Sequence, residues 1–467
     1  MYKFNNKLKR CIASILAVLT FATCLSIGGV AYAEDLVAIN ETNFPDKNFR
    51  AIITEIYDVN ANGYLEASER TNTMMTVSGY LEEICGADAK IETLKGVEYF
   101  YNLSKLYCAG IGLKELDVHL NTKLTRITCM GNELTSINLG TLNALTYLDC
   151  SVNNITALDI SGTPNIETLL CNSNAIASID VSSLANLTTL YINQNELTEL
   201  NLSSNEKLTN LACTFNHIKE LDLSKNTLLV DITEKMIGDQ WITQDAYINS
   251  NRIYINYVFK NPYNLVSSSL DTKSESEEGE VTTSAYNGSA FVADELTGIA
   301  GKLVDADGES RDGFVYKYNV NNAACDDMSV NIEVKRNFYQ VDFYLDETKE
   351  VRLSYNLVIS GNQATAPQIP EASTCKEFVK WSESYTNVTR DMSVYIVWRD
   401  NHDIVKSFND STGIINIYCT KCDEKTVRFD FGAAYNKKTG EDGFDEVGDV
   451  NHDGVINAKD YAILYRM

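Results

Sequence analysis

The sequence predicts a solenoid of stacked coils, preceded by a helical cap and followed by β-rich modules and a short helical tail. A leucine or isoleucine recurs every 21 residues from Leu103 to Leu229. A helical pattern with an acidic loop precedes these repeats, and runs of alternating apolar and polar residues follow them. We divide the chain into a leader (1–33), a cap (34–102), the repeats (103–237), a β-rich module (238–337), a second β module (338–400), a connector (401–442) and a tail (443–467).

The leader has the features of a secretory signal peptide. Basic residues precede an apolar run from Cys11 to Val30, and Ala31-Tyr32-Ala33 offers small residues at a cleavage point. The run contains Ser, Thr and Gly, which favours cleavage before Glu34 over a retained anchor. No second long apolar stretch occurs in the sequence. We therefore expect a secreted protein with no membrane span after cleavage.

The composition agrees with this compartment. The chain has 39 Lys and Arg residues against 64 Asp and Glu residues, which gives a net charge of −25. Such a surface repels nucleic acid and anionic membranes, and it suits a soluble protein that binds cations. With 44% hydrophobic residues, the chain can bury substantial cores in several modules.

The cap contains a helix followed by a cation-binding loop. Phe49, Ile52, Ile53 and Ile56 recur at helical spacing after Pro45. The following twelve residues, 58–69, have the EF-hand spacing, with glycine at place six. Its predicted Ca²⁺ ligands are Asp58, Asn60, Asn62, the carbonyl of Tyr64, and Glu69. We expect a structural Ca²⁺; the alternative is a helix cap without metal. Downstream, Met74, Met75 and Leu81 are expected to cover the end of the solenoid.

The repeats have no insertion. Each unit follows the pattern L-x-x-L-x-C-x-x-N-x-L, as in LTYLDCSVNNI. The second apolar column contains Leu106, Ile127, Leu148, Leu169, Leu190 and Leu211, and the asparagine column contains Asn132, Asn153, Asn174, Asn195 and Asn216. This period and pattern are typical of leucine-rich repeats, in which each unit forms one strand and one return segment. The asparagine amides can bond to backbone groups in the turns of successive coils. The extended form resembles the internalin-type surface proteins of Gram-positive bacteria.

Five cysteines form a third column, namely Cys108, Cys129, Cys150, Cys171 and Cys213, with Ile192 at the missing position. A position that accepts isoleucine is buried and apolar, so we favour packed free thiols. Disulfides are the alternative, because export permits them and stacked coils bring neighbouring cysteines close. A metal site is the weaker third option.

The strand residues between the buried columns are predicted to form the ligand-binding face of the solenoid. The strongest candidates are Tyr107, Arg126, Tyr147, Asn172, Tyr191 and Asn193, accompanied by Thr128, Met130, Asp149, Leu170 and Asn210. A mostly uncharged surface with Tyr and Asn suits contact with a protein or a glycan. The alternative is a solvated strand face without a ligand.

After the repeats, alternating runs predict β-strands. IYINYVF, FVYKYNV and MSVNIEV occur in 238–337, together with the acidic Ser-rich stretch SSSLDTKSESEEGE, a predicted loop or linker. Residues 338–400 contain VDFYLD, FVKWSESYTNVT and MSVYIVWRD. This second module resembles the B-repeat of internalin-like proteins, which implies a small β-grasp domain. Trp381 is then expected in its core.

The connector contains the lone CxxC motif Cys419-Thr420-Lys421-Cys422. A zinc knuckle needs two further ligands, and only His402 lies nearby in the sequence. We therefore favour a reduced pair or a local disulfide over zinc.

The tail contains a second loop of the same kind. Oxygen side chains occupy places one, three, five, nine and twelve of residues 449–460, with glycine at six. The predicted Ca²⁺ ligands are Asp449, Asn451, Asp453, the carbonyl of Val455, Asn457 and Asp460. The string GDVNHDGVINAKDYAILYRM also resembles one half of a type I dockerin. This resemblance implies attachment to a cohesin module of a polysaccharide-degrading complex of the cellulosome type, with Ala458, Lys459 and Arg466 facing the cohesin. Dockerins normally carry two such halves, and one is present here.

No catalytic signature is present in the sequence: GxSxG, HExxH and P-loop motifs are absent, and the chain has 4 histidines. We therefore expect a secreted, non-catalytic recognition protein of bacterial origin, bound to calcium and attached through its tail. The alternatives are an enzyme of polysaccharide breakdown with its catalytic site in 238–337, and a purely structural surface protein.

Overall fold

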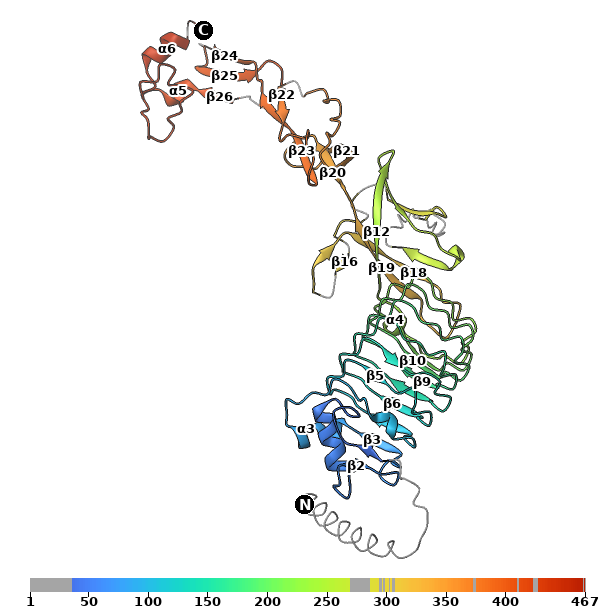
Figure 1. Cartoon of the computed structure of the whole chain (residues 1–467). Helices are drawn as coiled ribbons and strands as arrows, with labels where there is room; N and C mark the ends of the chain where they lie inside the picture. Colours follow the sequence, from blue (N-terminus) through green and yellow to red (C-terminus); the bar gives the residue numbers. More distant parts are fainter. Residues whose placement is uncertain are drawn as a thin grey trace, which may run out of the picture. The chain divides into compact units, whose positions relative to one another are not determined.

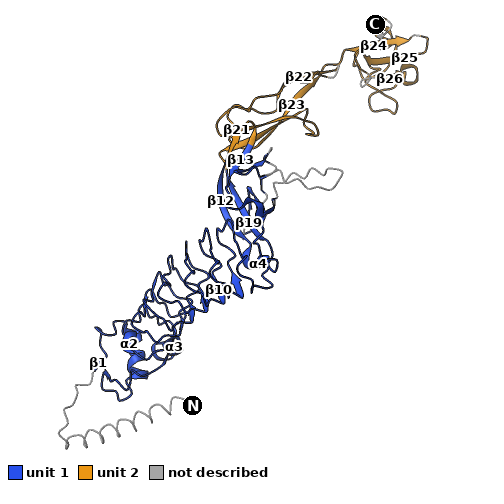
Figure 2. Ribbon diagram, turned by 90° about the vertical axis from the view of Figure 1, so that its right-hand side faces the viewer, with its two compact units in different colours: residues 1–246, 253–335 blue, residues 247–252, 336–467 orange. Residues whose placement is uncertain are grey.

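The computed structural model describes residues 36–268, 286–293, 296, 299–301, 303–304, 307–372, 375–409, 411–422, 427–464 and 466. The predicted signal peptide and most of the acidic Ser-rich stretch lie outside them. The chain divides into two compact units, one of residues 1–246 and 253–335 and one of residues 247–252 and 336–467 (Figure 2). Among the described residues, no helix has both the length and the apolar character that a membrane crossing requires.

The cap is built from short elements around a buried aromatic cluster. The predicted helix is present as α2, continued by the π-helical turn η1, and the Asp46 side chain caps it by accepting the N–H groups of Asn48 and Phe49. The elements are β1 (Val37–Ala38), α2 (Lys47–Ile52), η1 (Ile53–Tyr57), β2 (Tyr64–Leu65), β3 (Met74–Thr76), α3 (Ser78–Cys85) and η2 (Val97–Tyr99).

The predicted solenoid is a seven-stranded parallel sheet (Figure 1). Its strands are β3, β4 (Lys105–Tyr107), β6 (Arg126–Thr128), β8 (Tyr147–Asp149), β9 (Thr168–Leu170), β10 (Thr189–Tyr191) and β11 (Asn210–Ala212). From β4 to β11, each residue pairs with the residue 21 positions further along the chain, as Leu148 pairs with Leu169. The sequence period is therefore the register of the sheet. On the return side, β5 (Leu116–Asp117) and β7 (Ile137–Asn138) form a short parallel pair.

The cap closes the N-terminal end of the solenoid by adding β3 to the sheet. Met75 pairs with Leu106, and its side chain is 1% exposed. Leu81 of α3 is also buried, at 6%. Met74 does not contribute, contrary to the prediction: its side chain is 55% exposed, because neighbouring strand residues point to opposite faces.

The C-terminal end of the solenoid is closed by α4 (Glu234–Ile237). The N–H groups of Cys213 and Thr214 donate to the carbonyl of Met236, at 2.7 and 3.0 Å, where a further strand would otherwise pair. Ile237 is fully buried below the cysteine column. Gln240 follows, and its amide bonds to backbone groups of the last coil.

The rest of this unit is a six-stranded sheet in the order β14-β18-β19-β12-β13-β15. Its core is aromatic, and Tyr257, Phe291 and Tyr316 are each at most 2% exposed. The elements are β12 (Gln240–Asn249), β13 (Arg252–Asn256), η3 (Pro262–Asn264), β14 (Leu265–Ser268), β15 (Ala290–Ala293), β16 (Leu303–Val304), β17 (Ser310–Arg311), β18 (Gly313–Tyr318) and β19 (Met328–Lys335).

The second unit begins with a four-stranded sheet in the order β21-β20-β23-β22. The central strands β20 and β23 are parallel, an order compatible with the β-grasp prediction, although residues 360–372 contain no helix. Trp381 packs against the core of this sheet, with its ring 5.1 Å from that of Phe343. The strands are β20 (Phe338–Tyr344), β21 (Arg352–Ile359), β22 (Lys376–Trp381) and β23 (Met392–Asp400).

The connector and the tail share one hydrophobic core. A three-stranded antiparallel sheet supports two short helices, and Phe429 and Phe431 pack with Ile456 of the tail loop. Ile456 is fully buried, and its N–H donates to the carbonyl of Lys437 at 2.9 Å. The elements are β24 (Ile404–Asn409), β25 (Ile414–Cys419), β26 (Val427–Asp430), α5 (Phe431–Ala434) and α6 (Ala458–Leu464).

Candidate functional site

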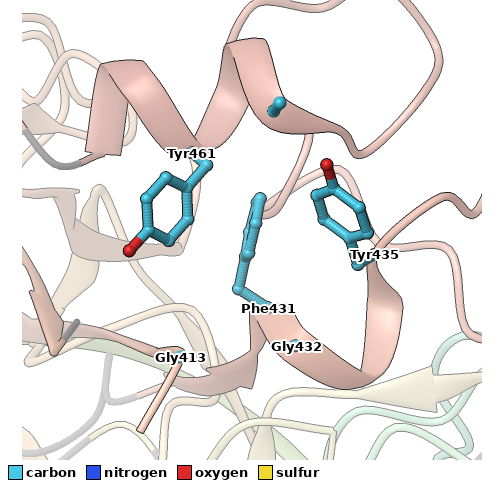
Figure 3. Close-up of a pocket in the computed structure, with 6 residues that line it drawn as sticks. Gly413, Phe431, Gly432, Tyr435 and Tyr461 are labelled. Atoms are coloured by element: carbon cyan, nitrogen blue, oxygen red, sulfur yellow. The ribbon is translucent and has the colours of Figure 1, made fainter. Parts of the chain in front are cut away.

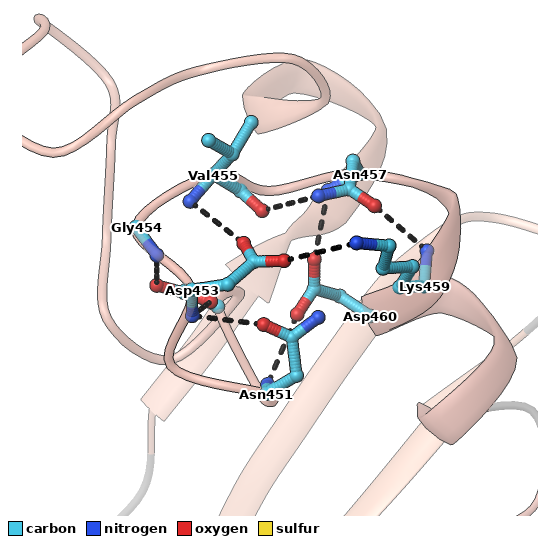
Figure 4. A network of polar contacts seen from close by, with 8 residues as sticks. Asn451, Asp453, Gly454, Val455, Asn457, Lys459 and Asp460 are labelled. Atoms are coloured by element: carbon cyan, nitrogen blue, oxygen red, sulfur yellow. Dashed lines mark hydrogen bonds and ion pairs between the residues drawn. The ribbon is translucent and has the colours of Figure 1, made fainter.

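The tail loop brings three predicted ligands together. Asp449, Asp453 and Asp460 each offer a carboxylate oxygen, and these oxygens lie within 4.8 Å of one another. Asp449 is 5% exposed and Asp460 is fully buried. Among the described residues, Lys459 forms an ion pair with this cluster: its Nζ lies 3.7 Å from the Asp453 carboxylate (Figure 4). Like charges this close and this buried repel one another unless a cation lies between them.

Backbone N–H groups hold these carboxylates in place. Asp449, at place one, accepts the N–H groups of Asp453 at 3.1 Å and Gly454 at 2.7 Å. Asp460, at place twelve, accepts those of Asn451 at 3.1 Å and Asn457 at 2.8 Å (Figure 4). The loop closes because Gly454 adopts a φ of 80°, which glycine tolerates without strain.

The three neutral predicted ligands of the tail, Asn451, the carbonyl of Val455 and Asn457, also lie in this loop. The Asn451 Oδ1 accepts the N–H of Asp453 at 2.8 Å. The carbonyl of Val455 accepts from Asn457 Nδ2 at 2.8 Å. Carboxylate, amide and carbonyl oxygens are the donors that Ca²⁺ takes, so the residues present fit a calcium ion.

The loop in the cap has the same hydrogen-bond skeleton. Asp58, at place one, accepts the N–H groups of Asn62 at 3.1 Å and Gly63 at 3.0 Å. Glu69, at place twelve, accepts the N–H groups of Asn60 at 3.4 Å and Glu66 at 3.0 Å, as in the tail, and also that of Val59 at 2.7 Å. Because the two loops differ in sequence and still share these bonds, the arrangement follows from the spacing of their ligands.

The carboxylates of the cap loop are also buried. Asp58 is 1% exposed and Glu69 is 7% exposed. Burial raises the pKa of the Glu69 carboxyl above its usual range and the Asp58 charge acts in the same direction, although backbone N–H groups oppose them. The amide side chains of Asn60 and Asn62 both donate to Glu66, and the N–H of Tyr64 donates to Asn62. A bound cation would relieve this burial of negative charge.

The predicted cohesin-facing residues are exposed on α6 and just after it. Ala458, Lys459 and Arg466 are all open to solvent. Ala458 also lines a pocket of about 430 Å³, together with Gly413, Phe431, Gly432, Tyr435 and Tyr461. Figure 3 shows the three aromatic rings that border this pocket. An aromatic pocket beside exposed polar residues is a surface that can receive a partner.

The predicted ligand face lies on the sheet of the solenoid. Tyr107, Arg126, Tyr147, Asn172, Tyr191 and Asn193 are all partly exposed. The Arg126 guanidinium lies 3.4 Å from the centre of the Tyr147 ring, so the two side chains of adjacent coils stack. Asp149 does not belong to this face, contrary to the prediction. It is 6% exposed, and it accepts the Ser151 hydroxyl at 2.7 Å.

The predicted cysteine column lies inside the solenoid. All five thiols are fully buried, and the structure describes them as free. Burial raises the pKa of Cys108, Cys150 and Cys213 to about 12. Thiols with such pKa values stay protonated and unreactive at neutral pH.

The CxxC motif has two partners, one of which the sequence did not reveal. Cys375, His402, Cys419 and Cys422 each offer a ligand atom within 4.8 Å of the others. The expectation that no further ligand accompanies His402 is therefore wrong. The sequence carried no signal for Cys375, because its position beside the motif depends on how strands 22 to 25 pair.

Sequence reasoning also missed one extension of the asparagine column and a second column of asparagines. Gln240 continues it beyond the repeats, donating to the carbonyls of Cys213 at 2.9 Å and Ile237 at 3.0 Å. A second column, Asn121, Asn205 and Asn226, lies at another corner of the coils and is fully buried. Asn205, for example, donates to the carbonyls of Val181 and Leu184. The sequence signal that could have revealed this second column is its spacing: Asn226 follows Asn205 by one period of 21 residues, and Asn121 precedes Asn205 by four such periods.

Three tyrosine hydroxyls of the β-rich module make structural contacts. The Tyr257 and Tyr316 hydroxyls lie 2.7 Å apart, and burial raises the pKa of both. Tyr316 donates to the carbonyl of Lys219, and Tyr318 donates to Glu220 at 2.8 Å. These contacts join the β-sheet to the last coils of the solenoid.

No protein-family model matches the chain, and no curated protein matches it. Among solved structures, internalin C2 from Listeria monocytogenes is 19% identical, with a TM-score of 0.30 over 43% of this chain and 97% of that one. InlP from the same species is 17% identical, with a TM-score of 0.30 over 64% and 98%. The functional domain of InlJ, which includes a cysteine ladder, is 17% identical, with a TM-score of 0.19 over 65% and 99%. At these TM-scores the likeness carries no inference about function. The leucine-rich repeat fold rests on the chain's own 21-residue register.

Proposed function

We propose that this chain is a secreted, non-catalytic recognition protein that binds a protein or a glycan on the sheet of its solenoid. The observation that carries this proposal is the row of partly exposed, mostly uncharged side chains on and just after the parallel strands from β4 to β10. Because adjacent strands of one sheet hold these side chains in fixed register, the face is preorganised, and binding there loses little conformational entropy.

The chemistry of this face favours contact over catalysis. Tyr107, Tyr147 and Tyr191 present rings together with hydroxyls, which suits both protein hot spots and sugar rings. The stack of Arg126 on Tyr147 adds a single positive charge held by an aromatic ring.

A double variant tests the face. Tyr147→Ala with Tyr191→Ala is expected to weaken capture of the bound partner at least tenfold in pull-downs against insoluble polysaccharides and extracellular proteins. Tyr263→Ala is the matched control, because Tyr263 is 95% exposed and lies outside the solenoid sheet. Binding that is equal in both variants would show that the face is only a solvated surface.

We further propose that both loops bind Ca²⁺ and that the tail attaches the chain to a cohesin module of a polysaccharide-degrading complex. The buried carboxylate cluster and the shared hydrogen-bond skeleton support calcium binding. The exposed Ala458, Lys459 and Arg466 support an attachment surface on α6.

The packing of the tail shows how a single dockerin-like segment is covered. In a dockerin, two halves cover each other's apolar residues. Here Phe408 and Phe431 contact the Tyr461 ring of α6, with centroids 5.2 and 5.9 Å apart. β24 and α5 thus supply the apolar cover that a second half would give, which supports a single half acting as a folded unit.

Cohesin pull-downs on the full chain, with and without a calcium chelator, test the attachment. We expect capture to need Ca²⁺ and to be lost in Asp453→Ala. Lys459→Glu is expected to keep calcium binding, measured by calorimetry, and to impair capture. Lys438→Glu, an equally exposed charge reversal on the same module, is the matched control. Calcium binding without capture by a panel of cohesins would leave a structural calcium site without an attachment role.

A further inference from the structure

Strand pairing in the second unit brings together four groups that are scattered in the sequence. Cys375 directly precedes β22, and its carbonyl accepts the N–H of Asn401 at 2.8 Å, which places it opposite the end of β23. His402 follows Asn401. Cys419 ends β25 and pairs with Ile404 at the start of β24. Two antiparallel ladders therefore meet where these residues lie.

The four side chains converge on one point. The Sγ atoms of Cys375 and Cys419 are 3.4 Å apart, and the Sγ of Cys422 lies 3.3 Å from Nδ1 of His402. Cys375 is 3% exposed and Cys419 is 6% exposed. The N–H of Lys421 points at the Sγ of Cys419, at 3.4 Å, as a donor that stabilises a thiolate.

We propose that Cys375, His402, Cys419 and Cys422 form a structural zinc site. A tetrahedral zinc ion with Zn–S bonds of about 2.3 Å and Zn–N bonds of about 2.0 Å separates its ligand atoms by roughly 3.5–3.8 Å. The observed 3.4 and 3.3 Å separations are close to these tetrahedral edges. A disulfide would bring two sulfurs to about 2.05 Å and would leave the imidazole beside Cys422 without a role.

The type and number of ligands indicate which metal the site binds and whether that metal is structural or catalytic. Thiolate and imidazole ligands suit Zn²⁺, whereas the oxygen-rich loops of the same chain suit Ca²⁺. Four protein ligands complete a tetrahedral shell and leave no open position for a substrate, so the site is structural. Cys375 lies just before β22 and His402 just after β23, whereas Cys419 ends β25 and Cys422 follows it. The ion therefore joins the β20–β23 sheet to the module that carries the tail loop.

Metal analysis of the full chain tests this site. The chain is produced with zinc, purified anaerobically and measured by elemental mass spectrometry, and we expect one zinc per chain. Replacement by Co²⁺ should give the intense visible absorption of tetrahedral, thiolate-bound cobalt. Cys375→Ser and His402→Ala should each weaken zinc binding at least tenfold. Cys325→Ser is the matched control, because Cys325 is a half-buried thiol outside the cluster.

His402→Cys keeps the test decisive if the weakened variants unfold. This variant retains four donors, so it should retain zinc, and its cobalt spectrum should gain thiolate charge-transfer intensity. An unchanged spectrum would show that His402 is not a ligand. The proposal is overturned if Cys375→Ser keeps full zinc binding, if cobalt shows a weak octahedral spectrum, or if peptide mapping of the zinc-supplied protein finds Cys419 in a disulfide.

Discussion

Replacing Asn153 by alanine removes a side chain that bonds to three segments of the solenoid at once. Its Nδ2 donates to the carbonyls of Cys129 at 3.1 Å and Cys150 at 3.0 Å. Its Oδ1 accepts the N–H of Leu134, also at 3.1 Å. The residue is 8% exposed, so water cannot readily take over these bonds.

The structure sets the size of the effect. The two carbonyls keep a second donor each, since Asn132 also donates to Cys129 at 2.9 Å and Asn174 also donates to Cys150 at 3.0 Å. The N–H of Leu134 loses its recorded acceptor. One buried, unsatisfied donor costs about 1–3 kcal/mol, and the lost bonds to the carbonyls add to it. We therefore expect the free energy of unfolding to fall by about 2–3 kcal/mol.

Tryptophan fluorescence can follow this loss in the unit that contains the solenoid. Trp241 belongs to that unit, and Trp381 and Trp398 belong to the other, so Phe in place of the latter two leaves one reporter. For a unit of this size, the expected change lowers the melting temperature by roughly 3–5 °C. Asn154→Ala is the matched control, because Asn154 is exposed, and it should change stability by less than about 0.5 kcal/mol. Equal melting curves for the two variants would refute the asparagine column as a stabilising device.

Three further outcomes are expected. Val152 has a φ of 55°, which strains a β-branched residue, so Val152→Asn should raise the free energy of unfolding by about 1 kcal/mol; a drop in urea midpoint would contradict this reasoning. Burial raises the pKa of Cys150 to about 12, so iodoacetamide at pH 8 should label it only after unfolding, and labelling in the native chain as fast as at half-exposed Cys325 would count against the buried column. Asp460→Asn should weaken calcium binding in titration calorimetry at least tenfold relative to the exposed control Asp442→Asn, and equal affinities would exclude Asp460 as a ligand.

Repeating residue patterns and short motifs in the sequence were sufficient to predict much of the fold. The 21-residue column from Leu106 to Leu211 became the register of the parallel sheet. The two twelve-residue loops form similar hydrogen bonds around their first and twelfth residues. The repeat register and the loops are both local features. Each coil contacts the coils one repeat away, and each loop contains its own predicted Ca²⁺ ligands.

Errors arose where the pattern ignored the direction of a side chain. Asp149 occupies a strand position that predicts exposure, yet it is 6% exposed and its carboxylate accepts the Ser151 hydroxyl. Met74 lies beside the buried Met75 and points away from it. A single sequence cannot decide whether such a side chain is buried or exposed, because this depends on the local hydrogen bonds and on the strand face that the side chain occupies.

The sequence by itself determined the repeat, the two loops and the buried columns. Each of these depends only on residues within one coil or loop, or within neighbouring coils. The tertiary structure alone decided that Cys375 joins Cys419, 44 residues away, and that Ile456 packs into the core of the β24–β26 sheet. These contacts depend on the pairing of separate strands. Strand pairing is fixed by the burial of whole apolar faces, and no spacing along the chain encodes it.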